Sequence, residues 1–583
     1  MFDATIGGST VLMPYGGKYQ RTETQVSVQK LPVKDGYTDT ASIMAYGYNP
    51  YIATWSPYHA AEYSVIEACT KVVAAGARYN KMRFSYQEYF ERMSSSKSWG
   101  KPLAALLGAL KMQIELELPS IGGKDSMSGT FNTISVPPML MAFGITTVNA
   151  NTVISPEFKS AGNKLYLIKH NENENYTPNI EELKDNFEFV STNIENKNII
   201  SAYALGFGGV IEALAKMSFG NKVGFNVNYK EELLDAYNYG SIVVEATSDL
   251  DYKNAIYLGS TTSNDYAEIN GVEFKLSELE EANTAKFNKV YKEKANNTCD
   301  LMDITPCKKE VTLLKNKDEV VAYFPVFPGT NCDYDTSKQF KRAGATIKST
   351  VFRNLTSDDI FASIDEMANN IDNCDIFVLS GGFSAGDEPD GSGKFIANVL
   401  NQSKIKDAIH RLIDRKGLIL GICNGFQALV KSGLLPYGRL GMVTNESPTL
   451  FRNDINRHIS QMVSTKIMTN ASPWLSSYET GEIHSIAVSH GEGKFVVSPE
   501  MAKKLADNGQ IAFVYVDEFG NPTAESPYNP NGSSYAIEGI ISEDGLILGK
   551  MGHSERYEEN IFKNISGNKN QNLFKNAVNY FKK

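Results

Sequence analysis

The sequence predicts a multidomain protein in which an α+β half is followed by a doubly wound α/β domain. Its 583 residues are enough for about four units of ~150 residues each. Apolar residues make up 42% and charged residues 21%, which is typical of folded globular proteins and excludes disordered, collagen-like and coiled-coil chains. Beyond residue 319, apolar strand-like runs alternate with helical ones, a pattern that indicates a parallel sheet with crossover helices.

The first half mixes strand-like and helical patterns, and we interpret it as two α+β units. Short β-rich runs surround one stretch, residues 60–75, whose apolar side chains recur at helical spacing. Residues 164–168 read as a strand. The Asn-rich residues 171–175 and the charged residues 180–187 beside it indicate a surface excursion. The second unit is expected to continue to about residue 270.

A change of pattern separates the two halves. Residues 278–294 read as a charged amphipathic helix, and the polar, lysine-rich residues 295–318 as a linker. Beyond the linker, the expected strands are 320–327, 375–380 and 417–422, and the expected helices include 333–343 and 425–431. The predicted domains are residues 1–155, 156–275, 276–318 (helix and linker) and 319–583.

Charge and cysteine content exclude several classes of protein. Lys and Arg (57) are outnumbered by Asp and Glu (67), so the net charge of −10 does not favour nucleic-acid binding. The longest apolar runs, such as residues 136–145, are shorter than the ~20 residues of a membrane helix, and residues 1–20 lack a signal-peptide pattern. We therefore expect no membrane association and a cytoplasmic location. The six cysteines show no CxxC spacing, which favours free thiols over disulfides or a zinc site.

The strongest local motif is GICNGFQ at residues 421–427. An apolar strand leads into a Gly-x-Cys-x-Gly turn and then a helix, which is the cysteine form of a nucleophile elbow. The glycines permit a tight turn, and the helix N-terminus beneath Cys423 favours the thiolate. The alternative is a small buried residue at a strand-to-helix turn.

Two further motifs fit a thiol-dependent hydrolase. GHSER at residues 552–556 follows a strand-like run, and in an extended segment His553 could face the thiol as general base while Glu555 orients its ring. SGGFS at residues 380–384 also follows an apolar strand, where backbone N–H groups near Gly382 and Phe383 could face a developing oxyanion. An exposed His and a plain Gly-Gly turn are the alternatives.

Together these motifs resemble the class I, triad-type glutamine amidotransferase domain. The resemblance implies that Cys423, His553 and Glu555 hydrolyse glutamine through a thioester and release ammonia. It also implies that the oxyanion and glutamine are bound by Gly382, Phe383, Asn424 and Gln427.

Other motifs of the second half resemble a narrower family, phosphoribosylformylglycinamidine synthase. They are GTNCD at 329–333, GGFSAGD at 381–387 and NPNGS at 529–533. The resemblance implies a ligase that converts formylglycinamide ribonucleotide, ATP and glutamine to formylglycinamidine ribonucleotide, ADP, phosphate and glutamate. Ser554 stands where a proline is usual, and Ala385 where an aromatic residue is common.

The first half carries a separate phosphate-binding motif, PSIGGKDSMSGTF at residues 119–131. It departs from a Walker A loop, since Leu118 occupies the first glycine position and Asp125 follows the lysine. Gly122 and Gly123 could expose N–H groups to phosphate, Lys124 supplies a positive charge, and Asp125 can hold Mg²⁺. A bland turn is the alternative. The motif, including Ser126, resembles the GGKDSMSG signature of the synthetase module, and residues 2–20 also resemble the family. Residues 1–155 and 156–275 are thus expected to be AIR-synthase-like domains.

The resemblance extends to two carboxylates and to the cofactors ATP and Mg²⁺. Asp39 and Glu67 resemble acids that hold nucleotide-bound Mg²⁺ in family members. Two positions differ from the family pattern: Lys71 replaces an asparagine one helical turn after Glu67, and Ala204 stands where some members carry a third acid. A lysine could therefore supply part of the cation's charge.

The resemblance covers nearly the whole chain but begins in the middle of the family's long form. We therefore expect a fragment, or a chain that pairs with a separately encoded N-terminal half. Three hypotheses remain: the C-terminal portion of the synthase, a free-standing glutaminase on a silent scaffold, and a truncated non-catalytic module that binds nucleotide and other chains.

Overall fold

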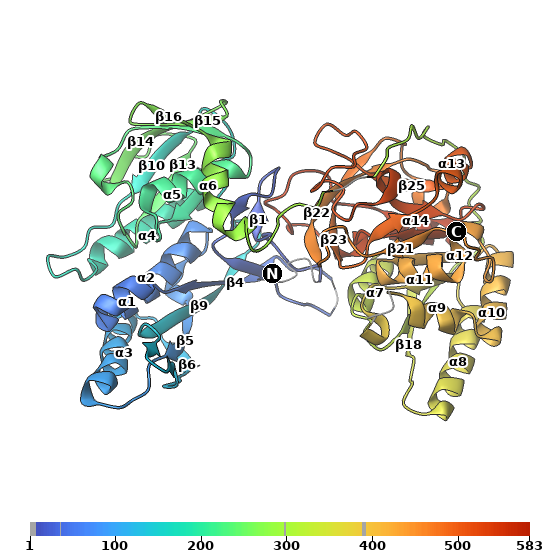
Figure 1. The fold of residues 1–583 in the computed structure, drawn as a ribbon, viewed down its shortest axis with the longest axis horizontal. Coiled ribbons are helices and arrows are strands. Elements are labelled where there is room, and N and C mark those ends of the chain that lie inside the picture. The colour runs from blue at the N-terminus through green and yellow to red at the C-terminus, as the bar shows by residue number, and fades with distance from the viewer. Residues whose placement is uncertain (1–6, 35, 297–298, 387–391) are drawn as a thin grey trace. The chain divides into compact units, whose positions relative to one another are not determined.

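The structure, a computed structural model, describes residues 7–34, 36–296, 299–386 and 392–583. It divides into two compact units (Figure 1). The N-terminal unit is Ser9–Val290 with Glu559–Ser566, and the C-terminal unit is Tyr291–Glu558 with Gly567–Lys583 and the described residues Gly7 and Gly8. The mixed α/β architecture confirms the predicted fold class. The boundaries of the four predicted segments stay a prediction.

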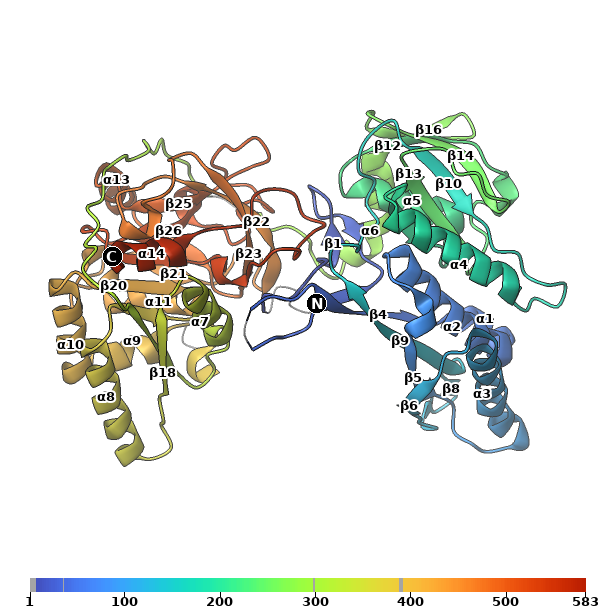
Figure 2. The same ribbon diagram turned by 180° about the vertical axis from the view of Figure 1, so that it is seen from behind.

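A five-stranded sheet forms the first part of the N-terminal unit as described. Its order is β3(Ser27–Lys30), β4(Thr40–Gly47), β9(Met139–Asn149), β5(Arg83–Tyr89) and β6(Ser120–Lys124). Helices α1(Pro50–Trp55), α2(Pro57–Ala74) and α3(Ser96–Leu116) group beside it in Figure 2. The predicted helix at 60–75 corresponds to α2. Ser56 caps the N-terminus of α2. The side chains of α2 are buried on nearly all faces of the helix, as expected of a helix inside a folded unit.

A seven-stranded sheet forms the second part of this unit. Its order is β11(Ile199–Ala204), β13(Ile242–Ala246), β10(Lys164–Ile168), β14(Ala255–Thr262), β12(Gly224–Val227), β15(Tyr266–Ile269) and β16(Val272–Lys275). Helices α4(Ile180–Glu195), α5(Gly209–Phe219) and α6(Leu276–Asn288) accompany it. The surface excursion predicted at 180–187 was wrong, because this segment is the start of α4. Its charged residues obscured an apolar face in which Leu183, Phe187 and Val190 are buried at helical spacing.

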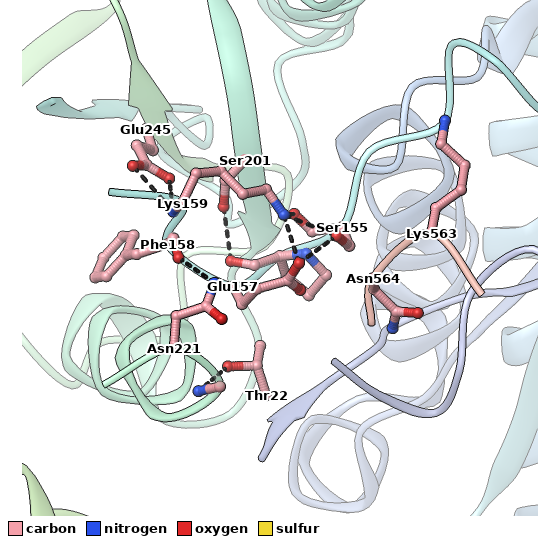
Figure 3. Close-up of polar contacts among 12 residues, drawn as sticks. Thr22, Ser155, Glu157, Phe158, Lys159, Ser201, Asn221, Glu245, Lys563 and Asn564 are labelled. Carbon is pink, nitrogen blue, oxygen red and sulfur yellow. Dashed lines mark hydrogen bonds and ion pairs between the residues drawn. The ribbon is translucent and has the colours of Figure 1, made fainter. Parts of the chain in front are cut away.

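Two buried carboxylates of the N-terminal unit, Glu157 and Glu245, accept hydrogen bonds from neighbouring residues (Figure 3). Glu157 is 3% exposed and accepts hydrogen bonds from Ser155 Oγ and Lys159 Nζ, both at 2.6 Å. Glu245, which is fully buried, accepts the backbone N–H of Lys159 at 2.8 Å. Asn221 donates to the Phe158 carbonyl at 2.8 Å. These contacts offset the cost of removing the carboxylates from water.

Residues 559–566 add a C-terminal segment to the N-terminal unit. Lys563 Nζ donates to the carbonyls of Ala150, Asn151 and Val153 at 2.7, 3.0 and 2.8 Å. Asn564 pairs with Met13 through both its amide oxygen and its amide nitrogen. The segment is therefore held by the backbone of residues far away in the sequence.

A nine-stranded sheet dominates the C-terminal unit in the part described. Its order is β18(Thr346–Val351), β17(Val321–Val326), β19(Ile376–Leu379), β20(Leu418–Ile422), β27(Ile547–Lys550), β26(Ile537–Ile541), β25(Ile511–Tyr515), β22(Ile459–Ile467) and β23(Ile483–His490). The strands from β18 to β27 run parallel, whereas β26, β25, β22 and β23 are antiparallel. The expected parallel sheet is thus half of a larger mixed sheet.

Helices flank the parallel half of this sheet. They are α7(Asp333–Arg342), α8(Ser357–Asp372), α9(Lys394–Leu400), α10(Ser403–Asp414), α11(Asn424–Ser432) and α14(Leu573–Phe581). Strands β19 and β20 are buried throughout, which explains their continuous apolar runs. Because parallel strands end at one edge, the loops after β19, β20 and β27 converge there.

Candidate active site

Cys423 lies at the turn between β20 and α11 and has a strained backbone. Its φ of 51° and ψ of −105° are unusual for a residue with a side chain. The flanking glycines are required by close approach: a Cβ at Gly425 would lie 2.0 Å from the Leu379 carbonyl oxygen, and one at Gly421 would lie 2.7 Å from the Gly425 carbonyl carbon and oxygen. The Gly-x-Cys-x-Gly spacing therefore lets the strand turn sharply into the helix.

His553 and Glu555 form a buried pair. His553 Nδ1 lies 2.6 Å from Glu555 Oε1, and both side chains are nearly inaccessible to solvent. Burial would raise the pKa of the Glu555 carboxyl, but the His553 ring and then Arg556 outweigh it and hold that pKa below its ordinary value. Glu555 is thus ionised and oriented toward the ring.

A turn, not an extended strand, brings this pair together. Residues Ser554–Arg556 form the 3₁₀ helix η6, whereas the sequence suggested strand alternation. The His553 N–H donates to the Ala487 carbonyl of β23 at 2.8 Å. The strand ends before His553, and the tighter turn allows direct hydrogen bonding two residues apart.

The loop after β19 brings the thiol and the imidazole to one place. A Cβ at Gly381 would lie 3.0 Å from His553 Cε1, 3.1 Å from Cys332 Sγ and 3.4 Å from Cys423 Cβ. Three side chains from different parts of the chain therefore surround Gly381, where an added Cβ would be tightly packed. Cys423 is 6% exposed, and its Sγ lies 3.7 Å from the Ser489 carbonyl oxygen.

Burial keeps the Cys423 thiol protonated in this geometry. Burial and then the nearby Cys332 raise its pKa well above the ordinary value, and Arg556 and the Asn424 N–H oppose this only in part. From the sequence we expect the helix N-terminus to favour the thiolate. The structure contains that contribution, but desolvation exceeds it. A base must therefore take the proton when the thiol attacks.

The residues predicted to bind the oxyanion and glutamine have different surroundings. The Phe383 N–H donates to the Gly329 carbonyl at 2.9 Å, and its side chain is 49% exposed. Gly382 has a φ of 148°, and a Cβ there would lie 2.5 Å from the Gly329 carbonyl oxygen. The Asn424 side chain accepts the Ser384 N–H at 3.3 Å, so it tethers the glycine loop to α11.

Gln427 also contacts neighbouring loops. It accepts the Asn424 side-chain amide at 3.0 Å and donates to the Glu492 carbonyl. Both amide side chains therefore hold loops around the thiol. Asp387, which belongs to the GGFSAGD motif, lies outside the described residues.

Cys332 is a second thiol at the same place, and the GTNCD motif in the sequence did not indicate a role for it. Its Sγ accepts a hydrogen bond from Arg556 Nη2 at 3.1 Å. Burial raises its pKa to about 12 despite Arg556. Cys332, His553 and Glu555 hold possible metal-binding atoms within 4.8 Å of one another. The Arg556 guanidinium already supplies a cation there, so nothing in this geometry calls for a metal.

A buried ion pair supports the loop that carries His553. Lys550 and Glu538 are fully buried, with Nζ and Oε1 3.6 Å apart. Lys550 Nζ donates to the Gly552 carbonyl at 3.0 Å and to Ser554 Oγ at 2.9 Å, and Glu538 Oε1 accepts the Gly552 N–H at 2.6 Å. The pair thus anchors the residues on both sides of His553. We call these contacts the Lys550 clamp. The apolar strand pattern around residue 550 gave no signal for it.

In the N-terminal unit the phosphate motif lies on an edge strand. β6 contains Ser120–Lys124, pairs with β5 and ends one residue before Asp125. Gly122, Gly123, Lys124 and Asp125 are exposed, and Ser126 Oγ lies 2.9 Å from Ser128 Oγ. Burial and then Asp125 raise the pKa of the neighbouring Glu88 to about 7. The structure therefore presents the predicted phosphate-binding residues in one accessible run.

The structure does not bring Asp39 and Glu67 together. Asp39 precedes the first residue of β4, whereas Glu67 accepts the N–H of Tyr48, just beyond the last residue of that strand. Eight strand residues at ~3.3 Å each separate the two ends by about 25 Å. The two carboxylates are therefore too far apart to bind the same ion.

Neither carboxylate is arranged for Mg²⁺. Asp39 accepts the side-chain amides of Asn151 and Asn560, both at 3.0 Å, and lies 3.4 Å from Lys30 Nζ. Glu67 lies 2.8 Å from Lys71 Nζ. Both acids are thus neutralised by lysine, and these residues do not fit the implied metal.

The second half of the chain is similar to known glutamine amidotransferase proteins. Residues 319–581 match the family of CobB/CobQ-like glutamine amidotransferase domains. The phosphoribosylformylglycinamidine synthase subunit PurQ of Chlorobaculum tepidum is 34% identical over 252 residues, which are 43% of this chain and 93% of that protein. PurQ of Gloeobacter violaceus is 32% identical over 253 residues, 43% of this chain and 94% of that protein.

Solved structures give two further similarities. The structure of PurLQS from Thermotoga maritima is 26% identical, with a TM-score of 0.33, and covers 45% of this chain and 99% of that one. T. maritima PurL complexed with ATP is 14% identical, with a TM-score of 0.37, and covers 53% of this chain and 55% of that one. No helix in the described part of the chain is long and apolar enough to cross a membrane.

Proposed function

Since the chain belongs to the phosphoribosylformylglycinamidine synthase family, we propose that it carries out glutamine-hydrolysing, ATP-dependent amidation of formylglycinamide ribonucleotide in purine biosynthesis. The observation that carries this proposal is the convergence of Cys423, His553 and Glu555 around Gly381. A thiol, a base and a carboxylate in this order form a nucleophilic triad. We also propose that the protein is located in the cytoplasm, as the sequence predicts.

The triad residues have separate roles in glutamine hydrolysis. Cys423 Sγ attacks the glutamine carboxamide carbon while its proton passes to His553. His553 then returns the proton to the leaving nitrogen, so that ammonia departs and a thioester remains. Water, deprotonated by His553, cleaves the thioester to glutamate and restores the thiol. The ionised Glu555 fixes the ring through Nδ1 and stabilises the imidazolium.

Backbone N–H groups stabilise the oxyanion formed in each attack. The Phe383 N–H is already bonded to Gly329, so we assign this role to the N–H groups of Gly382 and Asn424. The side chains of Asn424 and Gln427 position the surrounding loops.

The N-terminal unit contributes to the synthetase reaction. The substrate's amide oxygen is activated by the γ-phosphoryl group of ATP and leaves as phosphate when ammonia adds to the carbon. Gly122, Gly123, Lys124 and Ser126 are the residues we assign to phosphate binding. No step is assigned to Mg²⁺ at Asp39 or Glu67.

The proposal includes the other synthetase half, either on the same polypeptide or on a separate chain. The two alternatives from the sequence, a free-standing glutaminase and a non-catalytic nucleotide-binding module, are not favoured by the family relationship.

The test is turnover of formylglycinamide ribonucleotide with ATP and glutamine, by the chain alone and with an added N-terminal half from a related synthase. Glutamate release is measured in parallel. We expect glutamate and formylglycinamidine ribonucleotide to form together when the half is added. Glutamate without nucleotide product in both mixtures would instead support the free-standing glutaminase.

A further inference from the structure

Glu67 holds an ammonium group through specific contacts. Its Oε1 lies 2.8 Å from Lys71 Nζ, one helical turn later on α2, and its Oε2 accepts the Tyr48 N–H at 2.9 Å. Lys71 Nζ also donates to the Tyr46 carbonyl at 2.9 Å and lies 4.5 Å from the centre of the Tyr46 ring. A carboxylate, a carbonyl and an aromatic ring thus surround one cation.

A second carboxylate near Glu67 is neutralised in the same way. Glu212 on α5 lies 2.7 Å from Lys216, again one helical turn later, and accepts the Gly208 N–H at 2.6 Å. Glu23 also lies 2.9 Å from Lys216. Burial raises the pKa of Glu67, and the charge of Glu212 adds to this, so the two acids are close enough to interact. Each acid has its own lysine.

In the wild-type chain the oxygens that a divalent cation would need are already engaged. Mg²⁺ prefers octahedral oxygen ligands at about 2.1 Å, and the two Glu67 oxygens contact Lys71 Nζ and the Tyr48 N–H. An ammonium group 2.8 Å from the carboxylate also repels a second cation.

We propose that the Lys71 ammonium takes the position of a divalent cation at Glu67, so that this half of the synthetase module works there without a metal. The inference rests on the proposed function only in treating this unit as a nucleotide-binding module. It assigns Lys71 as the residue that determines which cation the site accepts.

The test measures Mn²⁺ binding to the full chain by electron paramagnetic resonance, with Mn²⁺ alone as the probe. The single variant Glu67→Gln is expected to bind the same number of Mn²⁺ ions as the wild-type protein. Lys71→Asn is expected to bind one more Mn²⁺ than wild type. Adding Glu67→Gln to that variant should weaken the new site at least ~10-fold. Lys71→Arg keeps the charge and should gain no site.

Two results would overturn the inference. One is loss of a bound Mn²⁺ when Glu67→Gln is made in the wild-type chain. The other is a folded Lys71→Asn variant, verified by circular dichroism, that gains none. If Lys71→Asn does not fold, Lys71→Gln replaces it in the Mn²⁺ measurement. The comparison of wild type with Glu67→Gln tests the inference independently of both variants. The assay needs neither glutamine nor ribonucleotide, so its failure is distinct from a failure of the proposed function.

Discussion

At the scale of single residues, Cys423 combines backbone strain with a protonated thiol. Its positive φ directs the side chain into the space around Gly381, and close packing of Gly421 and Gly425 holds the turn. Since burial raises the pKa of the thiol, its attack on glutamine needs a base that takes the proton. Activation then depends on His553 and Glu555.

Replacing Glu555 by Gln tests this dependence. The amide keeps the size of the side chain but removes the charge that stabilises the imidazolium. We expect glutamate release to fall by up to ~10⁴-fold. Circular dichroism should show an unchanged fold. A fall of less than ~10-fold would contradict the role of the carboxylate.

The pH dependence follows from the direction of the Glu555 shift. Its folded pKa is lowered, so its stabilising contribution is present above the unfolded pKa of about 4.3 and is lost as pH falls through the lower folded pKa. We therefore expect Glu555 to stay ionised between pH 5 and 8, so that a pH profile of glutamate release in this range shows no loss caused by its protonation.

At the scale of elements, the Lys550 clamp holds the loop that follows β27. This loop carries His553 and Glu555, so the clamp determines where these two side chains lie. We expect Lys550→Met to lower the stability by about 3–5 kcal/mol, because Glu538 is left buried without its counter-charge. The double variant Lys550→Met/Glu538→Met should recover much of that stability. It should still release glutamate ~10- to 100-fold more slowly, because Gly552 and Ser554 lose their anchor.

Denaturant titration and glutamate release separate the two effects of the clamp. Full activity in a stable double variant would show that the clamp only stabilises the fold.

The 559–566 segment gives the N-terminal unit a pH-dependent stability. Burial lowers the pKa of Lys563 from 10.5 to about 8, with a further effect of Lys159 that Asp39 opposes. Between pH 8 and pH 10.5, Lys563 binds a proton in the unfolded chain but has lost it in the folded protein. Its contribution to the free energy of unfolding therefore rises with pH in this range. Below pH 8 the cost of its buried charge is fully present.

Urea denaturation of wild type and Lys563→Met at pH 7 and pH 10 tests this linkage. We expect the free energy of unfolding of the wild type, minus that of the variant, to be larger at pH 10 than at pH 7. An equal or opposite change would show that Lys563 does not titrate as described.

Several elements were predictable from the sequence because their signals are local. The GICNGFQ turn and the helix at 60–75 have patterns that short windows reveal. Other features depend on distant residues. The antiparallel strands from β26 to β23 extend a sheet whose parallel part alone was expected. The Lys550 clamp joins an apolar strand to Glu538 in another strand.

At the scale of the whole molecule, the chain joins two units with separate cores. The glutaminase residues lie in the C-terminal unit, and the phosphate motif lies in the N-terminal unit. We therefore assign ammonia production to the C-terminal unit and ammonia use to the synthetase module. Glutamine and free ammonia provide independent entry points to these two activities.

The most direct test of this division of labour is the Cys423→Ala variant, reconstituted with an N-terminal half, with Cys332→Ala as a matched control at the second thiol. We predict that Cys423→Ala loses glutamate release by up to ~10⁶-fold and keeps ammonia-dependent synthesis of formylglycinamidine ribonucleotide. Cys332→Ala should remain within ~10-fold of wild type in glutamate release. Loss of ammonia-dependent synthesis by a folded Cys423→Ala variant, or retention of its glutamate release, would contradict the account.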